Sequence, residues 1–421
     1  MNERVIRQFG CWESPLSPAS LAWDRRLDAA GWDSDGETLV WLEGRSGRGV
    51  LVAQAASDGA SRDLTSDLSV RAEVGYGGGD FTVQGGAVYF VVHKTGRIYR
   101  QRLAGGTAEA VTPPFGEAAS PAVSADGRWL AYVHHDDRQI DRIAVVDSAG
   151  RRWPQILAEG HDFFMQPRWS PDGRRFAFIA WDHPQMPWDG TGLYLAELVT
   201  SDFDAPRLEH VTRVAGGLET AIFQPEFTPD GGSLLYVSDE TGWGRIYVRD
   251  LDSGGTRPIT PDGVEHAMPA WVQDQRTYAV AADGRHVVAV QSARGFHQVR
   301  RIEMATGASE PVEALAASTD VTRIDAAPRG ARVAIIGSGP KLPPRLVEHD
   351  FASGRTRVIA RSSGETVPAG ELSACEAISW TTGDGATAHG LYYPPASGRF
   401  AGSGRPPLVV LVHGGPTGQV R

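Results

Sequence analysis

The sequence predicts an all-β fold in which one large ring of short strands, a seven-bladed β-propeller, takes up most of the 421 residues. Two observations support this prediction: a glycine turn that returns seven times, and an apolar run that follows each turn. A third observation, a change of pattern after about residue 362, predicts that the ring is followed by the first strands of a second, α/β domain.

The glycine turns recur at intervals of 41 to 58 residues, which is the range of propeller blades. Glycine after aspartate or glycine supplies the positive φ that a tight hairpin needs. The seven turns are Asp35-Gly36, Gly85-Gly86, Asp126-Gly127, Asp172-Gly173, Asp230-Gly231, Asp283-Gly284 and Arg329-Gly330.

An apolar run follows each turn, and none of these runs alternates with polar residues. A strand that is apolar on both faces must be covered on both, as in a blade between two other blades. The runs are residues 39–42, 87–90, 129–133, 176–179, 234–237, 287–290 and 333–336.

Each blade also needs an inner strand before the turn and weaker strands after the run. Four inner strands are predicted at a proline, namely Ser120-Pro121 and residues 166–169, 224–227 and 268–271, and weaker strands at residues 97–99, 193–195 and 246–248. The blades then span residues 30–362. A β-sandwich or a solenoid is the alternative, but neither explains seven returns of the same turn and strand order.

Composition excludes several classes of protein. The 50 glycines and 27 prolines would suit a disordered chain, but 41% hydrophobic residues are enough for a core. A net charge of −10 disfavours nucleic acid and anionic membranes as partners. Cys11 and Cys375 form no disulfide framework, and the first residues lack a signal-peptide pattern, so we expect a cytoplasmic protein. No cofactor or metal site is predicted.

The loop of the fourth blade is longer than a hairpin needs. It contains Trp181, His183, Trp188 and Asp189 among several prolines. Such a loop packs against something, so it is either a structural plug or a surface that contacts substrate. His183 has no companion ligands at metal-binding spacing. The fifth blade has a similar corner with Glu240 and Trp243, which is either a solvated hairpin tip or an anchor for a substrate amine.

A glycine-rich segment, residues 76–81, resembles a phosphate loop only superficially. Neither a helix pattern nor a Gly-Lys-Ser/Thr sequence follows it, so nucleotide binding is not expected.

After residue 362 a polar linker leads to a predicted strand pair, residues 377–380 and 389–393, around the turn at Asp384-Gly385. A wholly apolar strand, residues 408–412, then runs into His413-Gly414-Gly415-Pro416. A turn of this kind after a buried strand is how α/β-hydrolases supply a backbone N–H to an oxyanion hole. Glycine lets that N–H approach the oxygen without a Cβ in the way, so Gly414 and Gly415 are the oxyanion-hole candidates.

A propeller followed by a strand and this turn resembles the prolyl oligopeptidase family of serine peptidases, especially its acylaminoacyl-peptidase and dipeptidyl-aminopeptidase-like branch. The resemblance implies a propeller that caps an α/β-hydrolase domain, restricts access and admits short peptides to a Ser-Asp-His triad. The segments that carry it are residues 12–15, 76–79, 170–191, 238–243 and 406–418.

The chain departs from that family because no G-x-S-x-G nucleophile motif is present. The expected domains are residues 1–29, a segment that packs on the hydrolase domain; 30–362, the propeller; and 363–421, a truncated hydrolase start. We expect no catalytic residue in this chain, no activity from it alone, and its own missing hydrolase domain as partner. The alternative is a non-enzymatic, TolB-like propeller that serves as a binding scaffold.

Overall fold

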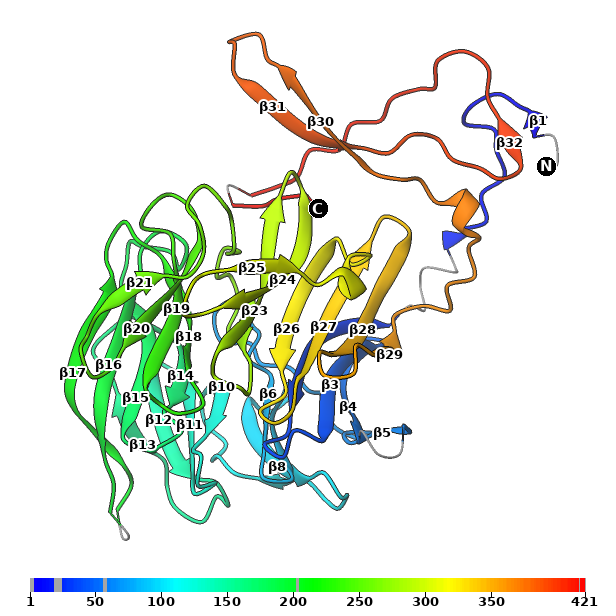
Figure 1. The fold of residues 1–421 in the computed structure, drawn as a ribbon. Coiled ribbons are helices and arrows are strands. Elements are labelled where there is room, and N and C mark those ends of the chain that lie inside the picture. Colours follow the sequence, from blue (N-terminus) through cyan, green and yellow to red (C-terminus); the bar gives the residue numbers. More distant parts are fainter. Residues whose placement is uncertain (1–3, 19–24, 56–58, 202–203, 416, 421) are drawn as a thin grey trace.

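A computed structural model of the chain describes residues 4–18, 25–55, 59–201, 204–415 and 417–420. Its main body is a ring of seven four-stranded antiparallel sheets, so the predicted seven-bladed propeller is confirmed (Figure 1). Each blade is built from four consecutive strands, and strand order in the sheet follows strand order in the chain.

The strands of the seven blades have the following bounds. Blade one is β2 (Arg26–Trp32), β3 (Thr38–Arg45), β4 (Arg48–Ala55) and β5 (Ser61–Asp63), and blade two is β6 (Phe81–Gln84), β7 (Ala87–Val92), β8 (Arg97–Arg102) and β9 (Glu109–Ala110). Blade three is β10 (Glu117–Val123), β11 (Trp129–His135), β12 (Asp141–Asp147) and β13 (Gln155–Ala158), and blade four is β14 (Phe163–Trp169), β15 (Arg175–Trp181), β16 (Gly192–Val199) and β17 (Arg207–Gly216). Blade five is β18 (Ile222–Phe227), β19 (Ser233–Ser238), β20 (Arg245–Asp250) and β21 (Thr256–Pro258). Blade six is β22 (Tyr278–Val280), β23 (His286–Ala293), β24 (Phe296–Glu303) and β25 (Ser309–Pro311), and blade seven is β26 (Asp320–Ala326), β27 (Arg332–Gly339), β28 (Leu342–Asp350) and β29 (Thr356–Arg361).

All seven predicted glycine turns join the first strand of a blade to the second. The glycine at the second position of each turn has a positive φ, from 64° at Gly284 to 81° at Gly330. Because this region is open to glycine and strained for other residues, the repeated turn fixes where each hairpin reverses.

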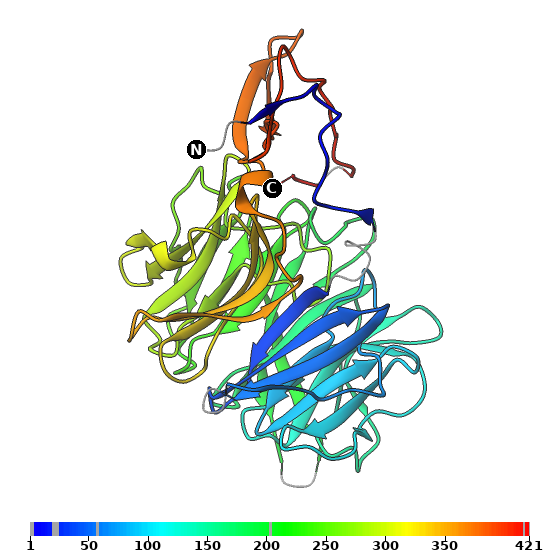
Figure 2. The same cartoon turned by 90° about the vertical axis from the view of Figure 1, so that its right-hand side faces the viewer.

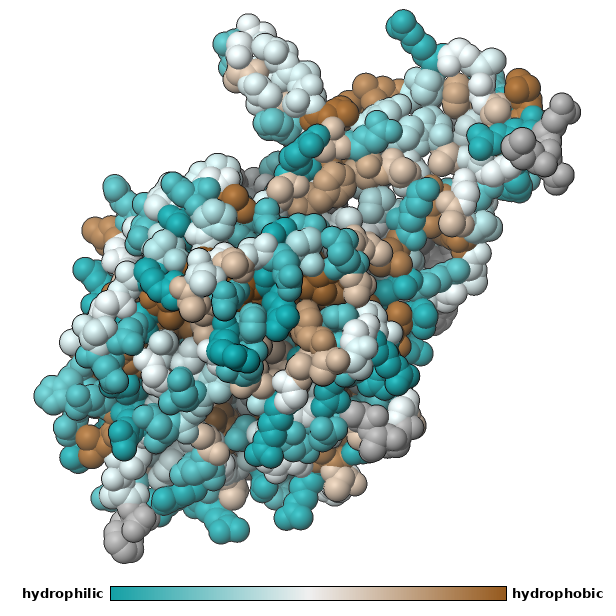
Figure 3. Space-filling view, viewed as in Figure 1, coloured by the Kyte–Doolittle hydropathy of each residue, from teal (hydrophilic) through white to brown (hydrophobic). Residues whose placement is uncertain are grey.

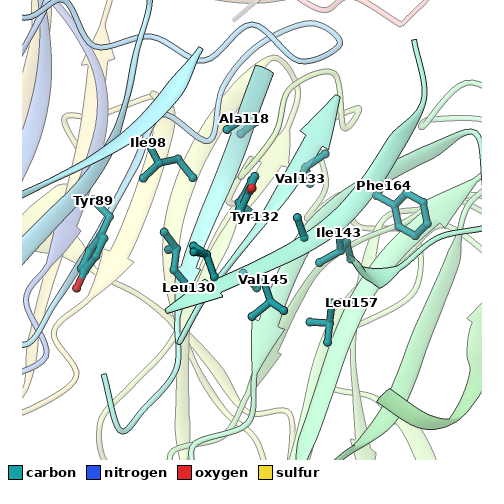
Figure 4. Close-up of a cluster of buried hydrophobic side chains, with 14 of the residues drawn as sticks. Tyr89, Ile98, Ala118, Leu130, Tyr132, Val133, Ile143, Val145, Leu157 and Phe164 are labelled. Carbon is teal, nitrogen blue, oxygen red and sulfur yellow. The ribbon is translucent and has the colours of Figure 1, made fainter. Parts of the chain in front are cut away.

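The core lies between the blades and is built mainly from the second strands. The six residues of β7 are all buried, as are four or more consecutive residues of β3, β11, β15 and β19. Figure 4 shows one interblade cluster, where Leu130 and Tyr132 of β11 lie between Ile98 of blade two and Phe164 of blade four. Runs without alternation are therefore apolar because both faces of the strand meet another sheet.

The ring closes between blade seven and blade one without a shared strand. The Trp32 N–H donates to Asp325 at 3.2 Å, and the Arg323 guanidinium donates to the Ala30 carbonyl at 3.3 Å. Leu27 and Trp41 of blade one pack with Ile336 and Leu346 of blade seven in one apolar cluster. Side-chain packing and these few polar contacts therefore join the two ends of the ring.

The alternation of antiparallel strands separates the loops into two faces. The seven glycine turns lie on one face. The hairpins between second and third strands, and the connections between blades, lie on the other. Both loops that stood out in the sequence, residues 182–191 and 239–244, are hairpins of this second kind, and we call their face the loop face.

The rest of the chain forms an extension above the loop face (Figures 1 and 2). The short strands β1 (Val5–Ile6) and β32 (Phe400–Ala401) pair in parallel, and the Arg399 guanidinium donates to the Glu13 carbonyl at 2.8 Å. The predicted strand pair is present as β30 (Glu376–Thr381) and β31 (Thr387–Tyr392). The N-terminal segment therefore packs against residues 399–401 from the C-terminal part of the extension.

Two predicted strands are absent. Residues 408–412 form no strand, and their side chains are 70–89% exposed because no described strand lies beside them to pair with. Residues 268–271 were predicted as the inner strand of blade six, but that strand is β22, and residues 268–271 belong to the connection before it. Figure 3 shows hydrophilic residues over much of the propeller surface, with hydrophobic residues along the extension above it. In the described part of the chain, no helix is long and apolar enough to cross a bilayer.

Candidate functional site

The His-Gly-Gly segment of the extension lies against the loop face of the ring. The indole N–H of Trp271 donates to Thr417 Oγ1 at 2.8 Å. A Cβ built on Gly415 would lie 3.7 Å from the same indole ring. The predicted oxyanion turn and the propeller thus meet at Trp271, which is on the connection between blades five and six.

Three aromatic side chains from different parts of the ring gather at this place. The rings of Tyr76 and Trp188 are 6.2 Å apart, and those of Trp188 and Trp271 are 5.8 Å apart. Tyr76 is 63% and Trp271 41% exposed. These neighbouring rings are tilted against one another by 40° and 48° and remain partly open to water, so they offer an apolar platform for an aromatic or aliphatic group.

A separate cavity of about 440 Å³ lies between residues of blades five and six on the loop face. Its lining includes Trp243 from blade five, Ser292 and Arg294 from blade six, Glu265, and Gln419 of the extension. Burial raises the pKa of Glu265, although backbone N–H groups, including that of Ala267 at 2.7 Å, oppose the rise. The backbone of Gly244, in the blade-five hairpin, also bonds to Glu265, and the His266 N–H donates to the Gly244 carbonyl at 2.8 Å, so this part of the connection is held to the hairpin beside the cavity.

Two of the residues predicted in the blade-four loop, Trp181 and His183, contact the start of their own blade, and Asp189 is bonded within the loop itself. Trp181 stacks on Phe163 at 5.1 Å, and His183 lies 2.9 Å from Asp162. Asp189 accepts the N–H of Met186 at 3.2 Å. Of the four residues predicted in this loop, Trp188 is the one whose ring belongs to the group formed with Tyr76 and Trp271.

The two residues predicted in blade five also differ in position. Trp243 is 44% exposed and lines the cavity. Glu240 is exposed, and its carboxylate lies 3.4 Å from Ser238 Oγ. Burial, followed by a hydrogen bond with Glu240 and the charge of that residue, raises the pKa of the Tyr247 hydroxyl to about 12.

The predicted turn at residues 413–416 is described as far as Gly415. Gly415 has a φ of 73°, and the backbone of Gly414 and Gly415 is exposed, while Pro416 lies outside the described residues. The positive φ explains why glycine is needed at position 415.

Sequence reasoning missed Tyr76, Glu265 and Trp271 as members of this face. The glycines at positions 77–79 were the signal that could have indicated Tyr76, because three consecutive positive-φ residues imply close backbone contact. Trp271 was misassigned to a strand, because its neighbour Pro269 suggested an inner strand like those of other blades.

A family model for the TolB β-propeller domain matches residues 137–378, which is more than half of the chain. The chain belongs to the TolB-type propeller family. Relatives in this family include the Tol-Pal system protein TolB of Bordetella pertussis, 24% identical over 147 residues, 27% of this chain and 32% of that protein. An uncharacterized protein of Agrobacterium fabrum is 27% identical over 163 residues, 35% of this chain and 53% of that protein.

Solved structures extend the likeness of this TolB-type chain over nearly its whole length. A puromycin hydrolase is 29% identical with a TM-score of 0.86, covering 99% of this chain and 66% of that one. A Mycobacterium tuberculosis puromycin-hydrolyzing peptidase is 25% identical with a TM-score of 0.83, covering 96% and 64%. Prolyl oligopeptidase B of Galerina marginata, 12% identical, shares the fold with a TM-score of 0.65 over 87% and 55%. The chain therefore fits the propeller part of the prolyl oligopeptidase family, and it spans just under two thirds of the two puromycin-hydrolysing relatives.

Proposed function

We propose that this chain forms the propeller part of a serine peptidase of the prolyl oligopeptidase family, in which the loop face covers the active site of an α/β-hydrolase domain. The contact between Trp271 and the His-Gly-Gly segment carries this proposal, because it brings the candidate oxyanion donor onto the propeller. The likeness to two puromycin-hydrolysing enzymes over at least 96% of the chain supports it.

In this proposal the Gly415 N–H donates to the oxygen that becomes negative during amide hydrolysis. A preorganised donor of this kind typically contributes about 3 to 4 kcal/mol to transition-state stabilisation. The nucleophile, its base and the orienting acid belong to the hydrolase domain, since the sequence has no G-x-S-x-G motif. Residues 1–421 alone then do not hydrolyse peptides.

The proposed substrates are short peptides or aminoacyl amides. The aromatic rings of Tyr76, Trp188 and Trp271 offer an apolar surface beside the oxyanion turn, suited to an aromatic or aliphatic substrate side chain. The proposed location is the cytoplasm.

Two measurements test the proposed function. The DNA that follows the codon for Arg421 is expected to encode, in one frame, a G-x-S-x-G motif followed by the Asp and the His of a triad. Fluorophosphonate labelling of purified residues 1–421 is expected to give no adduct. If no frame encodes such a motif, the peptidase proposal fails; if the chain is labelled, the nucleophile lies within it.

A TolB-like binding scaffold is the second candidate, and the family model over residues 137–378 favours it. A scaffold has no need of the contact between Trp271 and Thr417. Affinity capture of a stable protein partner that survives the Trp271→Ala change would support the scaffold over the peptidase.

A further inference from the structure

The connection between blades five and six crosses the middle of the ring. Blades two and three are the farthest from blade six in a ring of seven. Gln273, which lies on this connection, nevertheless reaches them. The Gln273 N–H donates to the Gly77 carbonyl at 2.8 Å, and Gln273 forms a parallel bridge with Gly78. The backbone of the connection leading into blade six is thus bonded to the connection leading into blade two.

The Gln273 side chain extends the crossing to two more blades. Ser120 of blade three donates its hydroxyl to Gln273 Oε1 at 3.0 Å, and Gln273 Nε2 donates to the Phe164 carbonyl of blade four at 2.9 Å. Ser120 is 2% and Gln273 6% exposed. Both ends of this amide are therefore paired in a site that excludes water.

The glycine-rich segment makes this close crossing possible. A Cβ on Gly78 would lie 2.5 Å from the Gln273 carbonyl oxygen, and one on Gly79 would lie 2.6 Å from the Ser120 nitrogen. Glycine is therefore required at both positions by the approach of two backbones, and not by a phosphate group.

Paired charges surround the crossing point. Asp274 lies 2.7 Å from Arg168 of blade four and 2.7 Å from Arg323 of blade seven. Arg276 lies 3.1 Å from Glu226 of blade five and 3.3 Å from Asp325 of blade seven. The side chains of these six residues are only 12–17% exposed. Three arginines thus balance three carboxylates at the ring centre.

Two buried glutamine side chains, those of Gln166 and Gln224, lie near these charges, and hydrogen bonds of Gln166 join blades four and five to the crossing segment. The Gln224 N–H donates to Gln166 Oε1 at 2.6 Å, and Gln166 Nε2 donates to the Gln275 carbonyl at 3.0 Å. Both side chains are 0% exposed. Blades four, five and six are thereby joined to the same crossing segment.

We infer that residues 266–277 close the centre of the propeller, so that a peptide cannot reach the loop face by threading through the ring. Hydrogen bonds and ion pairs run from this segment to blades two, three, four, five and seven. To pass along the axis, a peptide would have to separate buried charges and amides whose polar atoms would then lack partners. This closure does not depend on whether the chain serves a peptidase or a scaffold.

Thiol reactivity of residues 1–421 tests the closure. In a Ser120→Cys, Cys375→Ser variant, the exposed native Cys11 is an internal reference, and Cys375, which is partly exposed, is removed. Neutral iodoacetamide is expected to modify Cys11 at least about 100-fold faster than the thiol at position 120, as for a group exposed only by subglobal opening. Adding Gln273→Ala removes the amide over that thiol and is expected to raise its rate at least about tenfold without changing the circular dichroism spectrum.

Two results would overturn the inference. One is a thiol at position 120 that reacts within about tenfold of Cys11 in the folded chain. The other is a thiol that stays equally protected after Gln273→Ala, which would show that another group closes the centre. If Ser120→Cys does not fold, Thr277→Cys is the second probe, since Thr277 is 1% exposed and its hydroxyl has no hydrogen-bond partner among the described residues.

Discussion

Arg168 of blade four and Asp274, which precedes blade six, form a 2.7 Å ion pair at the centre of the ring. Burial opposes ionisation of Asp274, but Arg323, Arg168 and Arg276 outweigh it and hold its pKa well below the usual range. The same carboxylate accepts from Arg323 of blade seven. One aspartate therefore connects blades four and seven to the segment that leads into blade six.

Replacing Asp274 with asparagine is expected to destabilise the propeller strongly. The substitution keeps the shape but leaves Arg168 and Arg323 facing each other with one negative charge fewer. Breaking a buried pair in this way typically lowers the free energy of unfolding by about 3 to 5 kcal/mol. Urea denaturation followed by tryptophan fluorescence measures the change.

The matched control is Asp252→Asn. Asp252 is also paired with an arginine, Arg175 at 3.8 Å, but its side chain is 93% exposed. The expected loss is below about 1 kcal/mol, because water screens the pair. Equal losses in the two variants would show that the central pair contributes no more than a surface one.

Acid is expected to destabilise the fold through His266. This residue is 2% exposed, and burial lowers its pKa to about 4. The unfolded chain takes up a proton below about pH 6.5, whereas the folded chain does not do so until about pH 4, so stability falls as pH falls through that window. The loss is on the order of 3 kcal/mol.

A His266→Asn variant isolates this effect. The asparagine amide can replace the hydrogen bond between His266 Nδ1 and the Val290 carbonyl, which is 3.0 Å long, and it does not titrate. Asp80 has the opposite influence, because burial raises its pKa to about 6 and its contribution is lost as pH rises from about 4 to 6. The difference between native chain and variant removes the Asp80 contribution. A difference that stays constant from pH 7 to pH 4 would contradict the assignment.

Removing the indole donor of Trp271 is expected to loosen the His-Gly-Gly segment. Trp271→Phe keeps an aromatic ring but loses the 2.8 Å bond to Thr417. Hydrogen exchange of residues 413–420 should become several-fold faster, while exchange in β22 and β23 stays unchanged. Trp153→Phe, at a 69% exposed tryptophan that stacks on Phe115, is the control and should leave residues 413–420 unaffected.

Replacing the glycine of a repeated turn with alanine is expected to lower stability through backbone strain alone. Gly173 has a φ of 70° and open space where a Cβ would lie, so Gly173→Ala meets only the strain of a left-handed residue. The expected loss is about 1 to 2 kcal/mol. Gly383→Ala, at an equally open position without a positive φ, should change stability by less than about 0.5 kcal/mol. Thermal unfolding of the two variants compares them directly.

Much of the fold was predictable because its turns and strands depend on residues that are adjacent in the sequence. The turns at Asp172-Gly173 and Asp230-Gly231 and the runs after them follow from glycine conformation and from strand periodicity, which need no knowledge of distant residues. Residues 408–412 show the limit of that reasoning. They have the composition of a central strand, but a strand forms only where another pairs with it.

The candidate site was less predictable. Trp188 was singled out from an unusual loop, but the sequence does not reveal that its ring meets Tyr76 and Trp271 from other connections. Trp181 and His183, from the same loop, were equally conspicuous and hold the loop in place.

The sequence by itself determined the seven blades, their turns and the His-Gly-Gly segment, because each depends on the conformational freedom of a few adjacent residues. Only the tertiary structure decided what lies at the centre of the ring. Gln273 and Ser120 are 153 residues apart and meet across the axis because the circular arrangement of blades brings them together. Pairing of buried polar groups depends on such distant neighbours, and no local pattern specifies it.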